Sequence, residues 1–86
     1  MVHLGNSIKV SSANCQGLQN KEKRQDVVSY FRDMDINIVC LQDTHWTDKD
    51  LQNIRNLWGG ECFIHGVRTN SWGVAILIKK NLNMKL

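Results

Sequence analysis

Two stretches of the chain are almost continuously apolar, and each predicts a buried β-strand. Residues 36–41 have the sequence Ile-Asn-Ile-Val-Cys-Leu, and residues 73–78 have the sequence Gly-Val-Ala-Ile-Leu-Ile. The first run is rich in β-branched side chains and has no Gly or Pro, which is typical of a strand buried on both faces in a helix-covered parallel sheet. Asp43 comes just after this run, at the strand end where open α/β sheets bind ligands.

A third strand is predicted near the start of the chain. Residues 7–13 alternate apolar and polar side chains, which is the period of a half-buried strand. A turn follows, in which Gly17 is free to adopt a positive φ. Asn14 therefore stands directly after its strand, as Asp43 does after the next one.

Two segments between the strands have the spacing of amphipathic helices. The first covers residues 21–34, with Asn20 as its N-cap. The second begins after Thr47, where Asp50 completes a capping box, and ends at the pair 59–60, which is Gly-Gly.

The helical spacing also predicts which side chains are buried. The apolar faces are expected to hold Val27, Val28, Phe31 and Met34 in the first helix, and Leu51, Ile54 and either Leu57 or Trp58 in the second. The other side of the first helix carries Lys21, Lys23, Arg24 and Arg32. We interpret these cations as a solvent-exposed face rather than as a nucleic-acid-binding patch.

The order strand, helix, strand predicts a βαβ unit with parallel strands. Asn14 and Asp43 should then emerge at the same edge of the sheet and converge on one ligand. Residues 61–67 predict a further strand, which a loop at 68–72 would join to residues 73–78 as an antiparallel hairpin. The predicted fold class is therefore α/β, with the order β-α-β-α-β-β.

This layout leaves one face of the sheet uncovered. Successive crossovers of the same hand place both helices on one face, while the strands at 36–41 and 74–78 are apolar on both. Exposed apolar sheet of that extent is typical of a missing partner. We therefore expect residues 1–86 to be a partial domain, the opening portion of a larger one whose second layer is missing.

Composition and charge narrow the class of protein. The chain has 86 residues, enough for one small domain, and its net charge of +3 is compatible with a polyanionic partner without requiring one. Its three cysteines lack the spacing of a disulfide framework, and we expect Cys40 to be a core residue of its strand. The sequence has neither a signal-peptide pattern nor the apolar run of about 18 residues that crosses a bilayer. We expect an intracellular protein, nuclear or cytoplasmic, that does not associate with membranes.

Three motifs follow one another along the chain. They are Ser12-Ala13-Asn14 with Gly17-Leu18, then Leu41-Gln42-Asp43-Thr44-His45, and then Gly73-Val74-Ala75-Ile76-Leu77. Together they resemble the start of the endonuclease/exonuclease/phosphatase superfamily, which includes apurinic-site endonucleases and DNase I. In particular, they resemble the N-terminal endonuclease domain of LINE-type (non-LTR) retrotransposons. The resemblance covers the chain from Ile8 to about Leu82.

The resemblance implies a fold and a chemistry. The fold would be the N-terminal portion of a four-layer α/β sandwich, and the activity Mg²⁺-dependent cleavage of phosphodiester bonds in DNA, with Mn²⁺ as an alternative cation. It implies that Asn14 and Asp43 are catalytic, metal-binding residues. Asn14 would orient the phosphate and the metal environment, and Asp43 stands where the family has its metal-binding Glu. A reverse transcriptase region of the same polyprotein is the expected partner in the intact parent.

Two departures from the family bear on activity. Asp43 is one methylene shorter than Glu, a costly change for Mg²⁺ unless the loop adjusts. The family's phosphate-binding Tyr, its Asp-Asn pair and its closing Asp-His pair would all lie beyond Leu86, so we expect no useful turnover from this chain alone. Two alternatives stay open: part of a phosphoesterase that acts on phospholipid or inositol phosphate, and a non-catalytic remnant.

Several side chains have alternative interpretations. Position alone would equally allow Asn14 and Asp43 to serve only their turns. His45 is not interpreted as the family's catalytic His, but as a satisfied bystander, or alternatively as a surface or DNA-facing residue. Cys62 and His65 are three residues apart in a predicted strand, so they should face opposite sides rather than share a zinc ion. Trp46, Trp58 and Trp72 could stack on bases. For Trp58, on the apolar face of its helix, core packing is the better interpretation.

Overall fold

The chain folds into a small α/β domain, seen in a computed structural model that describes residues 2–4, 8–65 and 73–80. Every predicted helix and strand is present, and an additional short strand precedes them. The strands are β1 (Val2–Leu4), β2 (Ile8–Asn14), β3 (Ile38–Gln42), β4 (Glu61–His65) and β5 (Val74–Ile78). The helices are α1 (Lys21–Asp33) and α2 (Leu51–Trp58), the latter preceded by a 3₁₀ turn, η1 (Asp48–Asp50). The predicted loop at 68–72, with Trp72, lies outside the described residues.

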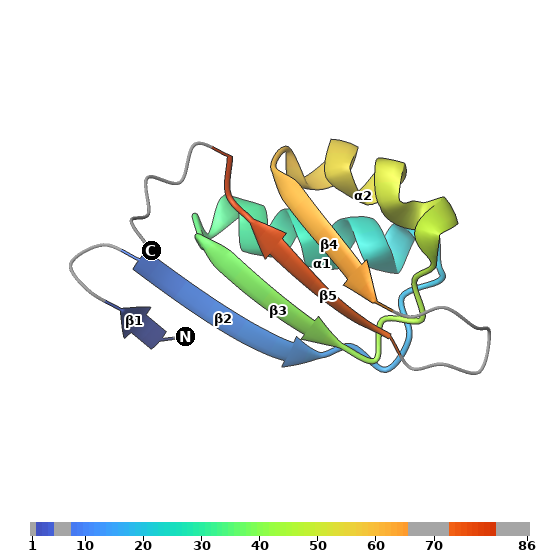
Figure 1. The fold of residues 1–86 in the computed structure, drawn as a ribbon, viewed down its shortest axis with the longest axis horizontal. Helices are drawn as coiled ribbons and strands as arrows, with labels where there is room; N and C mark the ends of the chain where they lie inside the picture. The colour runs from blue at the N-terminus through green and yellow to red at the C-terminus, as the bar shows by residue number, and fades with distance from the viewer. Residues whose placement is uncertain (1, 5–7, 66–72, 81–86) are drawn as a thin grey trace.

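The five strands form one mixed sheet in the order β1-β2-β3-β5-β4 (Figure 1). The predicted parallel pairing of β2 with β3 is confirmed, as is the antiparallel hairpin of β4 with β5. β5 lies between β3 and β4, antiparallel to both, so the sheet is not purely parallel. β1 is only three residues long, too short for a periodic signal, and it pairs antiparallel with the start of β2.

Both helices cover the same face of the sheet, as predicted, and they lie behind it in the view of Figure 1. Inward-facing residues of β3, β4 and β5 pack there against both helices in one apolar core. Its strand members are Val39, Leu41, Cys62, Ala75 and Leu77, and its helical members are Val28, Phe31, Ile54 and Trp58. The core position of Trp58 is thus confirmed. Within the described residues, neither helix has the length and apolar composition that a bilayer crossing requires.

The opposite face of the sheet is open and apolar. Phe63, Val74 and Ile76 are 55%, 45% and 41% exposed there, and Cys40 is half-buried beside them. The expectation that β3 is buried on both faces is therefore wrong in this chain, and so is the placement of Cys40 in the core. The strand is apolar on both faces, but the helices of the described residues cover only one of them.

The helix ends follow their capping signals closely. The Asn20 side chain accepts a hydrogen bond from the third amide of α1 at 3.0 Å, and Thr47 and Asp50 form the predicted capping box. Gly59 ends α2 in the left-handed region with φ 80°. One boundary is wrong: Met34 is the C-cap of α1 and is 43% exposed, because the helix ends before its side chain could join the apolar face.

Candidate functional site

The two residues predicted to share a ligand lie at the same edge of the sheet. β2 and β3 run parallel, and the register places Asn14 opposite Gln42, the residue before Asp43. Figure 1 shows the carboxyl ends of both strands side by side at that edge. The shared edge is therefore confirmed, while the binding of a cation by either residue stays a prediction.

Backbone hydrogen bonds continue between the two loops beyond the strand ends. The amide of Cys15 donates to the carbonyl of Gln42 at 2.8 Å, and the amide of Gly17 donates to the carbonyl of Asp43 at 2.7 Å. A third bond, 2.9 Å long, joins the amide of Leu18 to the carbonyl of Thr44. The loop after β2 is thus tied to the loop after β3, which fixes the backbone on which both candidate residues stand.

Left-handed backbone conformations are concentrated in these loops. Gln16, Asp43 and His45 have φ values of 53°, 56° and 59°. Such conformations cost a non-glycine residue about 1–3 kcal/mol each, and they cluster where function requires a special side-chain direction. Asp43 and His45 are two residues apart, so the strain lies on either side of Thr44. This clustering supports a functional role for the loop after β3.

The carboxylate of Asp43 faces a histidine. Nε2 of His45 lies 2.6 Å from Oδ1 of Asp43, and both side chains are about three-quarters buried. Oδ1 itself is buried, and among the described residues no donor is aligned with it in hydrogen-bonding geometry. The contact between the two side chains is therefore close but imperfectly aligned. His45, interpreted from the sequence as a bystander, thus contacts the candidate ligand, and its role stays a prediction.

Asn14 serves the turn that follows its strand. Its Oδ1 accepts a hydrogen bond from the amide of Gln16 at 3.3 Å, and the side chain is exposed. The turn-forming alternative for Asn14 is thus confirmed. It leaves room for a ligand as well, because an amide oxygen has a second lone pair.

Cys15 stands next to Asn14, and its thiol is a softer ligand than the oxygens that Mg²⁺ prefers. Burial raises the pKa of its thiol, and Asp43 acts in the same direction while Lys23 opposes them. Cys15 also lines a groove of about 440 Å³ that runs along α1 from Asn14 to Phe31.

A buried arginine holds the site loops in place, and the sequence interpretation missed it. Arg24, expected on the solvated side of α1, is only 4% exposed. Its Nε donates to the carbonyl of Leu18 at 3.2 Å, and its Nη2 lies 3.0 Å from Oδ1 of Asp50. The indole Nε1 of Trp46 donates to the same Leu18 carbonyl at 2.9 Å. The helical spacing could have indicated the burial of Arg24, because Arg24 is four residues before the buried Val28 and so lies on the same side of the helix.

Trp46 is part of this support rather than a surface for stacking bases. Its side chain is 1% exposed, and the guanidinium of Arg24 lies 5.9 Å from its ring centroid. The base-stacking interpretation of Trp46 is therefore wrong.

The predicted separation of Cys62 and His65 is confirmed, since Cys62 is buried and His65 is exposed. Burial raises the pKa of the Cys62 thiol to about 11.

The two candidate residues carry the kinds of oxygen atom that a hard divalent cation binds. Among the described residues, no group of three or more His, Cys, Asp or Glu side chains could hold a metal ion. Asp43 would supply one carboxylate, and Asn14 an amide oxygen. Mg²⁺ prefers such oxygen ligands, and it commonly binds through one or two carboxylates while keeping waters and substrate phosphates. The small donor set is compatible with such a cation and does not resemble a closed structural metal site.

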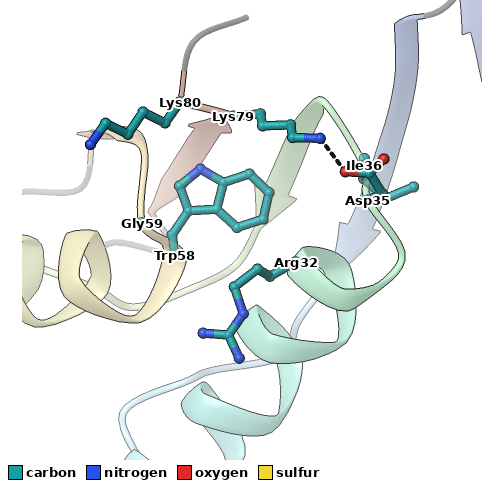
Figure 2. Close-up of a pocket in the computed structure, with 7 residues that line it drawn as sticks. All are labelled: Arg32, Asp35, Ile36, Trp58, Gly59, Lys79 and Lys80. Atoms are coloured by element: carbon teal, nitrogen blue, oxygen red, sulfur yellow. Dashed lines mark hydrogen bonds and ion pairs between the residues drawn. The ribbon is translucent and has the colours of Figure 1, made fainter.

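A second pocket lies at the opposite end of the sheet, and three of its four charged side chains, those of Arg32, Asp35 and Lys79, have partners. It has a volume of about 180 Å³, and the indole of Trp58 lies between Arg32 and the two lysines that follow β5 (Figure 2). Arg32 donates to the carbonyl of Leu57 at 2.8 Å, which caps the end of α2. Lys79 pairs with Asp35 and lowers the pKa of that carboxyl. These pairings explain the pocket as a structural junction of helix and strand ends.

Comparison with known families gives a match over most of the chain. The sequence model of the Endonuclease/Exonuclease/phosphatase family matches residues 11–85. The matched region begins within β2 and includes both candidate residues. It therefore covers the whole edge of the sheet at which they stand.

Proposed function

Because the chain belongs to the endonuclease/exonuclease/phosphatase family, whose members are phosphodiesterase- and nuclease-type hydrolases, we propose that it is part of a Mg²⁺-dependent DNA endonuclease of a LINE-type retroelement. Members of the family generally depend on divalent metals. The observation that carries the proposal is the parallel pairing of β2 with β3, which brings Asn14 and Asp43 to one edge.

In this proposal each candidate residue has a defined task. Asp43 holds the cation through its carboxylate, and Asn14 presents its amide to the cation or to the substrate phosphate. A bound Mg²⁺ would neutralise developing charge on the phosphoryl oxygens and orient the attacking water. The strained loop after β3 and its backbone bonds to the loop after β2 keep both side chains at the same edge.

We propose further that the chain is catalytically incomplete by itself. The exposed apolar face of the sheet supports this proposal, since such a face is normally covered in a working enzyme. A second layer on that face would also be the place from which a general base and further phosphate ligands could reach the site. DNA and a reverse transcriptase region of the same polyprotein are the proposed partners of the intact protein.

A phosphoesterase that acts on phospholipid or inositol phosphate is the second candidate, because the same superfamily uses the same type of site. The motif Leu-Gln-Asp-Thr-His at 41–45 and the strand Gly-Val-Ala-Ile-Leu at 73–77 favour the nuclease. A non-catalytic remnant is the third candidate. It predicts that the chain binds no divalent cation at Asp43.

Calorimetric titration with Mg²⁺ tests the metal site directly. We expect weak binding by the chain, a loss of affinity of about tenfold or more in Asp43→Ala, and retained binding in Asp43→Glu, which restores the family's longer carboxylate. Asp48→Ala is the matched control, because Asp48 is an exposed acid in the neighbouring turn. Equal Mg²⁺ affinity of the chain and Asp43→Ala would contradict the proposed site.

Plasmid nicking separates the nuclease from its alternatives. We expect no nicking by the chain alone, and Mg²⁺-dependent nicking when it is fused to the downstream half of a LINE-type endonuclease. Asp43→Ala in the fusion should abolish nicking. Phosphate release from an inositol phosphate without nicking would favour the second candidate, and nicking by the unfused chain would contradict its incompleteness.

A further inference from the structure

His45 makes a contact that the proposed function leaves unused. Its Nε2 lies 2.6 Å from Oδ1 of Asp43, and only about a quarter of each side chain is exposed. Both residues have left-handed backbones, with φ values of 56° for Asp43 and 59° for His45. The two strained residues flank Thr44, which is fully buried, so the backbone fixes where both side chains start. The contact is therefore set by the backbone conformation of the loop.

The contact with His45 involves only one of the two carboxylate oxygens of Asp43. Oδ1 is buried and faces the histidine, so a cation that enters from solvent would have to bind through Oδ2. A carboxylate that is free to rotate would lose conformational entropy when it binds a metal. A carboxylate that already contacts a neighbouring side chain has less of this freedom to lose, and groups around a metal-binding carboxylate commonly orient it.

We propose that His45 is a positioning residue for Asp43: it holds Oδ1 and so presents Oδ2 of the same carboxylate to a divalent cation. This inference rests on the proposed function, because it requires that Asp43 binds the cation. It assigns no proton transfer to His45.

Titration with Mn²⁺, followed by the electron paramagnetic resonance signal of the free ion, tests the proposal. We expect His45→Ala to weaken Mn²⁺ binding by about tenfold, within the roughly 10- to 100-fold range seen when such supporting partners are removed. His45→Gln should recover most of the affinity, because the Gln side chain places an amide nitrogen near the position of Nε2. His65→Ala is the matched control, an exposed histidine at the end of β4. Circular dichroism and thermal unfolding should show folded proteins in all cases.

The outcomes separate this inference from the proposed function. Unchanged Mn²⁺ affinity in His45→Ala, with binding by the unmodified chain, would overturn the positioning role alone. Equal losses in His45→Ala and His45→Gln would also overturn it, since the loss would then follow the ring and not the contact with Oδ1. Failure of the unmodified chain to bind Mn²⁺ would overturn both proposals. Weakened binding in His45→Ala, recovered in His45→Gln and absent from the control, would support the positioning role.

Discussion

Arg24 links the loop after β2 to both helical segments. Its guanidinium connects the start of α1 to the loop after β2 through Leu18, and to the second helical segment through Asp50 and Asn53. A buried cation is stable only if its partners are in place, and here three acceptors surround it. The same group therefore stabilises the fold and fixes the loop that precedes α1.

Replacement of Arg24 by Ala is expected to lower the free energy of unfolding by about 3 kcal/mol, because removal of one member of a buried ion pair leaves the other unpaired. Asp50 keeps some access to water, which places the expected loss near the lower end for such pairs. Urea denaturation measures it. Lys21→Ala, at an exposed position on the same helix, is the control and should change stability by less than about 0.5 kcal/mol. A loss as small as that in Arg24→Ala would contradict the network.

Two adjacent glycines, Gly59 and Gly60, follow α2, and each is required for a different reason. Gly59 has φ 80°, and a Cβ built on it would meet no atom within 4 Å. A Cβ on Gly60 would instead lie 2.4 Å from the carbonyl oxygen of Ile78 and 2.8 Å from the amide of Lys80. The first glycine is required by the backbone conformation, and the second by the close approach of the strand β5.

The two glycines should therefore respond differently to alanine. Gly59→Ala is expected to cost about 1 kcal/mol, the conformational price of a left-handed Ala, and to lower Tm by roughly 4–8 °C in a domain of this size. Gly60→Ala should cost at least about 2 kcal/mol, because backbone atoms of β5 must move to admit the methyl group. Thermal unfolding of both variants checks the order. A larger loss of stability in Gly59→Ala than in Gly60→Ala would contradict the close approach of Gly60 to the backbone of β5.

At the scale of the whole molecule, the open face of the sheet dominates the expected behaviour. Phe63 and Ile76 are cross-strand neighbours in the register of β4 with β5, and both are largely exposed. Large exposed apolar patches mark interaction surfaces or cause aggregation. The isolated chain should therefore be marginally soluble and should self-associate through this face.

Sedimentation velocity at micromolar concentrations is expected to show association of the chain and a shift toward monomer in Phe63→Lys. The introduced charge would have to be buried at any contact made by this face, which is unfavourable. Tyr30→Lys is the matched control, because Tyr30 is an equally exposed aromatic residue on α1 and should leave association unchanged. A monodisperse monomer with a sharp cooperative melt would contradict the role of the open face.

The sequence by itself determined the local structure, because the signals involved act over a few residues. Asn20 and the Thr47–Asp50 capping box mark the starts of both helical segments, and Gly59 marks an end, since each satisfies or frees neighbouring backbone groups. The βαβ order also determined that Asn14 and Asp43 share an edge, because two neighbouring strands joined by a helical crossover run parallel and end on the same side of the sheet.

Only the tertiary structure decided what surrounds these residues. Arg24 is buried because two helices and a loop meet over it. Cys40 is only half-buried although its sequence neighbours are apolar, because no helix of the described residues covers its face. The contact of His45 with Asp43 depends on two left-handed residues, which no short-range pattern announced. Burial and side-chain contact depend on segments distant in the sequence, so periodicity predicts which face of an element is apolar but not what packs against it.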